Sequence, residues 1–273
     1  MPTIRRLLAT GLALLLLHAS SGCRRVPGTD RSQFNVFSRE TEVTMGANAY
    51  REIMAGEEQV TGTPMARILE RVGRRIAAVS PDPGYEWEFA LVRSKTVNAF
   101  ALPGGKVVFY TGMLPYFKTE ADLAVVMGHE IAHVIARHGG ERMSHGVFIS
   151  GVSTAIGAYL ETQGVERSQR NMWLAALGAG AQLGVTLPFS RKHEHEADKL
   201  GMRYMAKAGY DPRAAPAFWD SFKGASGTPE FLSTHPHDES RATELRAQLQ
   251  QVLEHYRAAE TQHGMGATLP SDR

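Results

Sequence analysis

The sequence predicts a mainly helical α+β fold with one small β-sheet. Apolar residues recur at helical spacing in two early stretches, residues 37–55 and 64–79. Between residues 85 and 111 the pattern changes to short runs rich in β-branched and aromatic residues, "YEWEFALVR", "TVNAFAL" and "KVVFYTG". The spacing is helical again from residue 119 to about residue 256. Helices and strands that are segregated along the chain are typical of α+β domains.

Composition narrows the class of protein. The chain has 273 residues, of which 43% are hydrophobic and 21% charged, as in ordinary folded proteins. The formal net charge is +2. Two of the positive charges, Arg5 and Arg6, belong to a segment that we expect to be removed, so the net charge of the remaining chain is near zero. No cluster of basic residues indicates nucleic acid, so we expect no nucleic-acid partner.

The N-terminus has the organisation of a bacterial export signal, which we assign to residues 1–22. Two arginines precede an apolar run at residues 7–17, and small residues lead to Cys23. The run is shorter than the roughly 20 residues of a membrane-spanning helix. Cys23, the only cysteine, resembles a lipoprotein processing site, which predicts a lipidated tether over residues 23–35. The alternative is ordinary signal cleavage that leaves an unused thiol.

The rest of the chain is assigned to one domain, residues 36–258, and a disordered tail, residues 259–273. The tail is polar and aperiodic. Two apolar stretches, residues 147–160 and 172–188, are each shorter than about 20 residues and are interrupted by polar residues or glycine. We therefore expect helices packed on the protein there, and not membrane spans.

The stretch "MGHEIAHVIARH", residues 127–138, carries the strongest chemical signal. A capping box begins this helix at Thr119, and we expect the helix to run through His138. His129 and His133 are one turn apart on one side, and Glu130 reaches into the space beside them. The remaining circumference is largely apolar, which indicates a buried helix. Burying these three side chains without partners would cost several kcal/mol, so a divalent metal ion is expected there.

Zinc suits this pattern of ligands. Imidazole nitrogens bind zinc, and a glutamate that does not bind it can accept a proton from the attacking water. The alternative is a chance pentapeptide on a solvated helix face, which the apolar context disfavours. One Zn²⁺ ion per chain is predicted.

A catalytic zinc needs a third protein ligand. The segment "SRKHEHEADKLGMRYMAKAG", residues 190–209, offers four candidates: His193, Glu194, His195 and Glu196. Glu194 has Asp198 one helical turn further on, where Asp198 can orient a ligand histidine, whereas Glu196 has only Leu200 at that offset. We assign Glu194 to the metal, and Asp198 to a hydrogen bond with the second ring nitrogen of His129 or His133. The alternative is a charged surface face.

These residues also carry a family resemblance. "GHEIAHVIARH" followed by "FSRKHEHEADKLGM" resembles the zinc metallopeptidase family that includes HtpX, the CaaX prenyl protease and the bacterial periplasmic proteases LoiP and BepA. Further matches are "NAFALPGGKVVFYTG" at 98–112, "AGYDP" at 208–212 and "STHPHDESR" at 233–241. "RSQFNVFSRETEVTMGANAYREI" is similar to the lipoprotein branch, LoiP in particular. The resemblance covers residues 31 to about 256.

The resemblance implies a gluzincin-type metallopeptidase domain with a small β-sheet beside the H-E-x-x-H helix. It implies His129, His133 and Glu194 as zinc ligands and Glu130 as the general base. It also implies that His235 closes the site as a fourth zinc ligand, which would make this histidine a switch. Two alternatives are a loop histidine without metal contact and a histidine that stabilises the transition state.

Substrate binding is predicted on the strand Asn98, Ala99, Phe100 and Ala101. If this is an edge strand beside the zinc helix, its backbone can hold an extended polypeptide as an added strand. The alternative is an ordinary core strand. We predict a zinc metalloendopeptidase of the bacterial periplasm that cleaves unfolded or misfolded envelope proteins and is held by its lipid at the outer membrane. The alternatives are an envelope chaperone or assembly factor with structural zinc, and a peptidase confined to short peptides.

Overall fold

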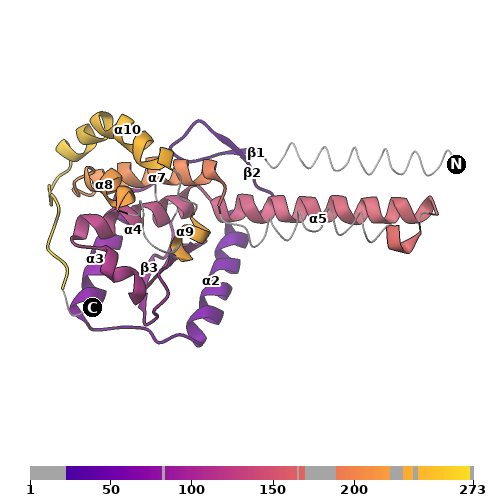
Figure 1. The fold of residues 1–273 in the computed structure, drawn as a ribbon, viewed down its shortest axis with the longest axis horizontal. Coiled ribbons are helices and arrows are strands. Elements are labelled where there is room, and N and C mark those ends of the chain that lie inside the picture. The colour runs from indigo at the N-terminus through magenta and orange to yellow at the C-terminus, as the bar shows by residue number, and fades with distance from the viewer. Residues whose placement is uncertain are drawn as a thin grey trace. The chain divides into compact units, whose positions relative to one another are not determined.

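The computed structural model describes residues 23–81, 84–164, 166–169, 189–221, 230–235 and 239–270 (Figure 1). The predicted signal, residues 1–22, and the whole apolar stretch at 172–188 lie outside these ranges. The chain divides into two compact units, residues 1–39 with 139–187 and residues 40–138 with 188–273. The second unit contains every residue predicted for the metal site.

The two predicted early helices are α2 (Arg39–Ala55) and α3 (Pro64–Val79). The Thr63 side chain accepts a hydrogen bond from the Ala66 N–H, and Pro64 occupies the first turn, so α3 begins with a good N-cap. Its apolar stripe is buried: Met65, Leu69, Val72 and Ile76. The helical periodicity therefore predicted both the helix and its buried face.

The predicted small sheet is confirmed. It contains β3 (Glu88–Val92), β4 (Ala99–Leu102) and β5 (Lys106–Tyr110) in the order β3-β5-β4, and a 3-10 helix, η1 (Thr111–Tyr116), follows. Strand β5 is parallel to β3 and antiparallel to β4. Gly104 and Gly105 connect β4 to β5 with φ of 87° and 89°, which glycine adopts without strain. This order makes β4 an outer strand.

The H-E-x-x-H helix is α4 (Glu120–Ile135), and it is shorter than predicted. The Thr119 side chain accepts from the Asp122 N–H, and the Asp122 carboxylate accepts from the Thr119 N–H, so the capping box is present. The helix ends at Ile135 because Arg137 has a left-handed backbone with φ 58°, and α5 (His138–Thr162) begins at the next residue. Continuation of one helix through His138 was therefore wrong.

The second ligand helix is α7 (Arg191–Lys207), which packs along α4 (Figure 1). The helix backbones meet at Gly128 and Gly201, where a Cβ on Gly128 would lie 2.7 Å from the Gly201 carbonyl oxygen. Only glycine permits this approach, which brings the polar faces of the two helices together. The described residues of the unit also form α8 (Ala214–Asp220), α9 (Glu230–Thr234) and α10 (Glu239–Arg257).

The C-terminal segment is ordered along the start of α4 as far as Pro270, so the predicted disordered tail was wrong for these residues. The backbone N–H groups of Glu120 and Ala121 donate to the carbonyls of Ala267 and Met265, each at 3.0 Å. The first N–H groups of a helix have no acceptor within the helix, and the carbonyls of this segment supply acceptors for two of them. Leu269 is also buried.

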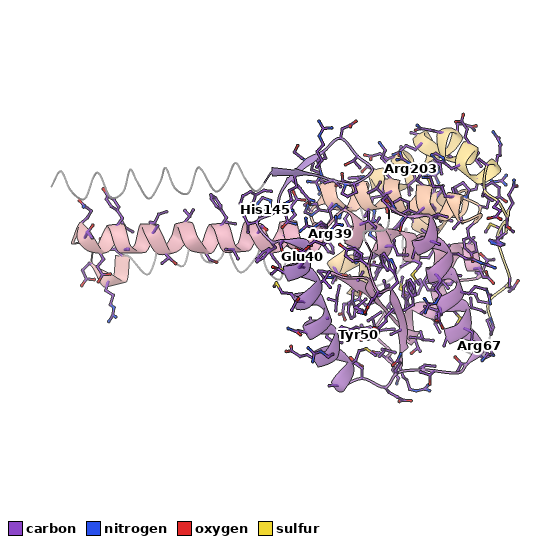
Figure 2. The ribbon with its side chains drawn as sticks, turned by 180° about the vertical axis from the view of Figure 1, so that it is seen from behind. Arg39, Glu40, Tyr50, Arg67, His145 and Arg203 are labelled. Atoms are coloured by element: carbon purple, nitrogen blue, oxygen red, sulfur yellow. The ribbon has the colours of Figure 1, made fainter. Side chains whose placement is uncertain are left out.

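The first unit contains a β-hairpin where a tether was predicted. Strands β1 (Cys23–Arg25) and β2 (Ser32–Phe34) pair antiparallel, so the segment is not an irregular linker. The ring centres of Phe34 and of His145 on α5 are 5.6 Å apart, and Figure 2 labels His145. Among the described helices, none combines the length and the apolar character that a membrane span requires.

Candidate metal centre

Four buried side chains meet at the crossing of α4 and α7. His129 and His133 come from α4, Glu194 from the first turn of α7, and His235 directly follows α9. One ligand atom from each lies within 4.8 Å of the others. We call these residues the four-donor cluster. The helical spacing of the histidines and the face of Glu194 are as the sequence predicted.

The separations within the four-donor cluster fit a metal ion. The Nε2 atoms of His129 and His133 are 3.0 Å apart, and they lie 3.3 and 3.4 Å from the Glu194 oxygens. Four atoms bound tetrahedrally at about 2.0–2.1 Å from a zinc ion are about 3.3 Å from one another. Ring nitrogens and a carboxylate buried this closely need a cation among them. The donor set therefore fits a divalent metal.

His235 occupies the fourth position. Its Nδ1 atom lies 3.2 Å from His129 Nε2 and 3.2 Å from Glu194 Oε1. The His235 backbone N–H donates to the Phe231 carbonyl at 2.8 Å, so the end of α9 fixes the backbone position of His235. The interpretation of a loop histidine remote from the metal residues does not agree with this position.

Glu130 lies beside the four-donor cluster and is not one of its members. Its Oε1 atom is buried, makes no hydrogen bond to the described residues, and lies 3.4 Å from His235 Nε2. Burial raises the pKa of the Glu130 carboxyl. An acidic oxygen with a raised pKa and an open hydrogen-bonding position is suited to accept a proton.

Asp198 and Arg241 support the ligands from behind. Asp198 Oδ1 lies 3.0 Å from His129 Nδ1, so the predicted contact is present, on His129 and not on His133. The Arg241 guanidinium donates to both Asp198 oxygens at 2.6 and 2.7 Å, and its Nη1 atom is 3.0 Å from Glu194 Oε2. It also lies over the Trp219 ring, 3.7 Å from the ring centre. Arg241 was not predicted from the sequence, although the motif "STHPHDESR" ends on it.

Charge in the metal-free protein is set by these neighbours. Burial disfavours a charged His129, but the Glu194 and Asp198 carboxylates outweigh it and raise the pKa of His129 to about 9. Burial lowers the pKa of His133 well below its usual value. Burial also opposes ionisation of Asp198, yet Arg241 outweighs it and lowers the pKa of that carboxyl. The carboxylates therefore remain charged and attract a cation.

The remaining candidates of the α7 segment have other partners. Glu196 Oε2 lies 3.0 Å from His138 Nε2, and His138 Nδ1 lies 2.9 Å from His133 Nδ1. His193 stacks on His138 with ring centres 4.5 Å apart, while His195 pairs with Glu244 at 3.0 Å. From the sequence, Glu196 was set aside as a metal ligand in favour of Glu194, and His138 was given no role.

Strand β4, the predicted substrate strand, is at the edge of its sheet beside α4, and its outer side is partly covered. The Phe231 N–H donates to the Val97 carbonyl at 2.8 Å, and Ala99 is fully buried. Ala101 is only half-buried. The N-terminal end of the strand, next to Val97, is therefore the end that α9 contacts.

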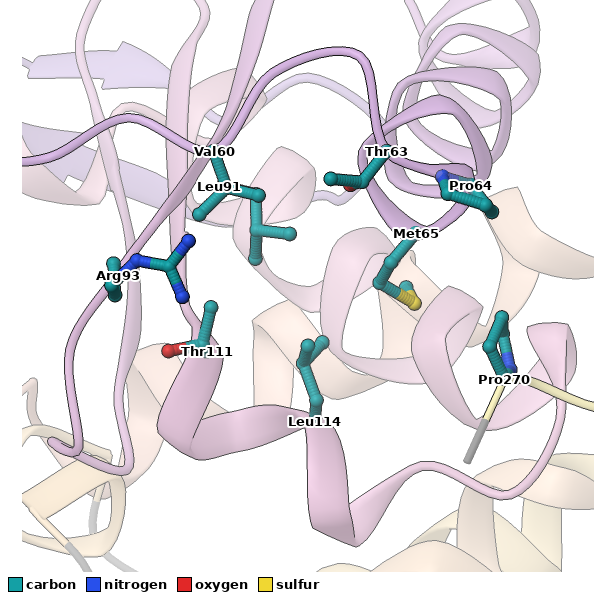
Figure 3. Close-up of a pocket in the computed structure, with 9 residues that line it drawn as sticks. All are labelled: Val60, Thr63, Pro64, Met65, Leu91, Arg93, Thr111, Leu114 and Pro270. Carbon is teal, nitrogen blue, oxygen red and sulfur yellow. The ribbon is translucent and has the colours of Figure 1, made fainter. Parts of the chain in front are cut away.

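A pocket of about 310 Å³ lies elsewhere in the second unit. Its lining is mainly apolar, as Figure 3 shows, and comprises Val60, Thr63, Pro64, Met65, Leu91, Arg93, Thr111, Leu114 and Pro270. None of these residues belongs to the four-donor cluster, so the pocket is separate from the metal centre.

Two histidines one helical turn apart, joined by a glutamate from a second helix, are the donor set of a metallopeptidase of the H-E-x-x-H class. The profile of "Peptidase family M48" matches residues 65–249, which is more than half of the chain. The chain belongs to peptidase family M48.

Individual relatives agree with this assignment. The mitochondrial metalloendopeptidase OMA1 of Schizosaccharomyces pombe is 37% identical over 227 residues, 81% of this chain and 64% of the relative. OMA1 of Arabidopsis thaliana is 36% identical over 168 residues, 61% and 32% of the two chains. The beta-barrel assembly-enhancing protease of Escherichia coli is 29% identical over 233 residues, 83% and 47%. The chain spans less than two thirds of the length of each relative.

Proposed function

We propose that the protein is a zinc metalloendopeptidase that hydrolyses peptide bonds in unfolded polypeptides. The observation that carries this proposal is the four-donor cluster with Glu130 beside it. The names of the relatives, metalloendopeptidase and protease, support the same activity.

His129, His133 and Glu194 would hold the zinc ion. Bound zinc would supply Lewis acidity, which polarises a peptide carbonyl and makes water a nucleophile near neutral pH. Glu130 accepts the proton of the attacking water and returns it to the leaving amine, because its buried oxygen has no competing hydrogen bond in the described residues. Asp198 keeps the His129 ring in one tautomer and orientation.

The described conformation corresponds to a latent enzyme. A catalytic zinc site needs a position open to water, and His235 Nδ1 occupies the fourth position. Helix α9, which ends directly before His235, also contacts the chain just before β4, where the Phe231 N–H donates to the Val97 carbonyl. One segment, residues 230–235, thus covers both the metal position and part of the substrate strand. Movement of this segment would open both together.

The substrate would bind as an additional strand on β4. The Tyr110 N–H donates to the Asn98 carbonyl, which marks this pair as hydrogen-bonded in the antiparallel ladder. Because inward and outward residues alternate, the backbone groups of Ala99 and Ala101 point away from β5. Recognition through backbone groups depends little on the substrate side chains, which suits unfolded chains.

The location that we propose is the bacterial periplasm, with Cys23 lipidated and anchored in the outer membrane. Residues 1–22 have the organisation of an export signal, and Arg24 replaces the aspartate that commonly retains lipoproteins at the inner membrane. Misfolded envelope proteins are then the proposed substrates. The name of the Escherichia coli relative, which refers to β-barrel assembly, supports an envelope role.

The experiment that tests the activity uses the Glu130→Gln variant and casein as the unfolded substrate. We expect the wild type to cleave casein and the variant to retain zinc while losing cleavage by orders of magnitude. A wild type that binds zinc but leaves casein intact while cleaving short peptides would favour a peptide-only enzyme. Full function of Glu130→Gln in cells would favour the alternative of a chaperone with structural zinc.

A further inference from the structure

A chain of three buried side chains leads away from the four-donor cluster on the His133 side. His133 Nδ1 lies 2.9 Å from His138 Nδ1, and His138 Nε2 lies 3.0 Å from Glu196 Oε2. The His138 side chain is fully buried, and the Glu196 side chain is 8% exposed. Water therefore cannot readily replace these contacts.

The protons of this chain can be assigned from its geometry. His133 Nε2 faces the four-donor cluster, so a neutral His133 ring that binds metal through Nε2 carries its proton on Nδ1. That N–H can only donate, so His138 Nδ1 accepts it and the proton of a neutral His138 is on Nε2. His138 Nε2 then donates to the Glu196 carboxylate. Each atom of the chain has one compatible role.

The backbone break at Arg137 makes this chain possible. In a continuous α-helix, positions five apart are about 140° apart around the axis, so residues 133 and 138 would face different directions. The left-handed conformation of Arg137 ends α4 and turns the backbone before His138. A non-glycine residue there costs about 1–2 kcal/mol. The buried ion pair of Arg137 Nε with Glu42 Oε2, at 2.9 Å, holds it in place.

We infer that His138 and Glu196 are positioning residues for His133, an assignment that rests on the proposed zinc function. His129 is oriented directly by the Asp198 carboxylate, and His133 reaches its carboxylate through one intervening imidazole. The chain fixes the tautomer and the ring plane of His133 and increases the basicity of its metal-binding nitrogen. Both ligand histidines of α4 are thus anchored by carboxylates of α7.

Three variants test this inference, with zinc affinity measured by chelator competition. His138→Leu removes both hydrogen bonds, whereas His138→Asn keeps an oxygen near the place of Nδ1 and loses only the contact with Glu196. Glu196→Gln removes the charge at the end of the chain. The matched control is Glu120→Gln, which alters another buried carboxylate, at the start of α4, that pairs with Arg71 and does not contact a ligand histidine. Melting temperatures of the zinc-free proteins report structural damage separately.

We expect zinc affinity about 10- to 100-fold lower in His138→Leu and Glu196→Gln, and a smaller loss in His138→Asn. Glu120→Gln should lower the melting temperature and leave zinc affinity within about twofold of wild type. Affinities of Glu196→Gln and His138→Asn equal to wild type would overturn the inference, as would an equal loss in Glu120→Gln. A wild type that binds no zinc would instead refute the proposed function, so the two failures are distinguishable.

Discussion

Asp198 Oδ1 lies 3.0 Å from His129 Nδ1, the ring nitrogen that faces away from the four-donor cluster. Because this contact fixes the ring, Asp198→Ala should weaken zinc binding about 10- to 100-fold. Chelator competition on the purified protein measures the change. Asp198→Asn keeps an acceptor for the His129 N–H and should lose less affinity. Equal losses in the two variants would show that the charge of Asp198, and not its hydrogen bond, matters.

Arg241 is buried against two carboxylates, and its removal would leave both without their cation. Arg241→Met should lower the free energy of unfolding by about 3–5 kcal/mol, the usual cost of breaking a buried ion pair on one side. Urea unfolding of the zinc-free protein measures this. Arg74→Met, which breaks the exposed pair with Glu70, is the control and should cost far less. Similar losses in both variants would contradict the prediction.

Local spacing made much of the site predictable. The positions of His129, His133 and Glu130 follow from 3.6 residues per turn, and the offset to Asp198 distinguished Glu194 from Glu196. Both inferences depend only on the spacing of residues within a single helix, α4 in the first case and α7 in the second. The capping box at Thr119 was equally local, and it is present.

The contacts that escaped prediction depend on tertiary structure. Arg241 reaches Asp198 from a different helix, and His138 reaches His133 only because the backbone breaks at Arg137. No sequence pattern predicts that a residue such as Arg137 adopts the left-handed backbone conformation. The polar C-terminal segment was expected to be disordered, yet its backbone carbonyls bind the first turn of α4. Amino-acid composition describes the side chains, whereas these hydrogen bonds join backbone groups, so composition could not predict them.

The outer side of β4 offers a test of substrate binding. Proline at Ala101 would remove an outward-facing N–H without removing a hydrogen bond to β5, because alternation turns this residue away from β5. We expect Ala101→Pro to cleave casein at least several-fold more slowly with unchanged zinc content. Ala101→Val retains the N–H and should cleave at nearly the wild-type rate. Wild-type cleavage by the proline variant would rule out strand addition at this position.

His235 combines two contacts that have opposite consequences for activity. Its Nδ1 atom occupies the fourth position of the four-donor cluster, and its Nε2 atom lies 3.4 Å from Glu130 Oε1, the proposed proton acceptor. Both contacts obstruct catalysis in the described conformation, since one fills the water position and the other places an imidazole ring beside the base without a hydrogen bond. His235→Ala should therefore cleave casein faster than wild type and retain zinc through the other three ligands.

The matched control is His195→Ala, because His195 is a partly exposed histidine that pairs with Glu244 away from the cluster. It should leave both zinc content and cleavage unchanged. If His235 instead stabilises the transition state, His235→Ala would lose activity without losing metal. Unchanged cleavage would reduce His235 to a structural residue at the end of α9. We expect the faster rate, because the helix that positions His235 also contacts Val97, just before β4, through Phe231, so that one movement releases both.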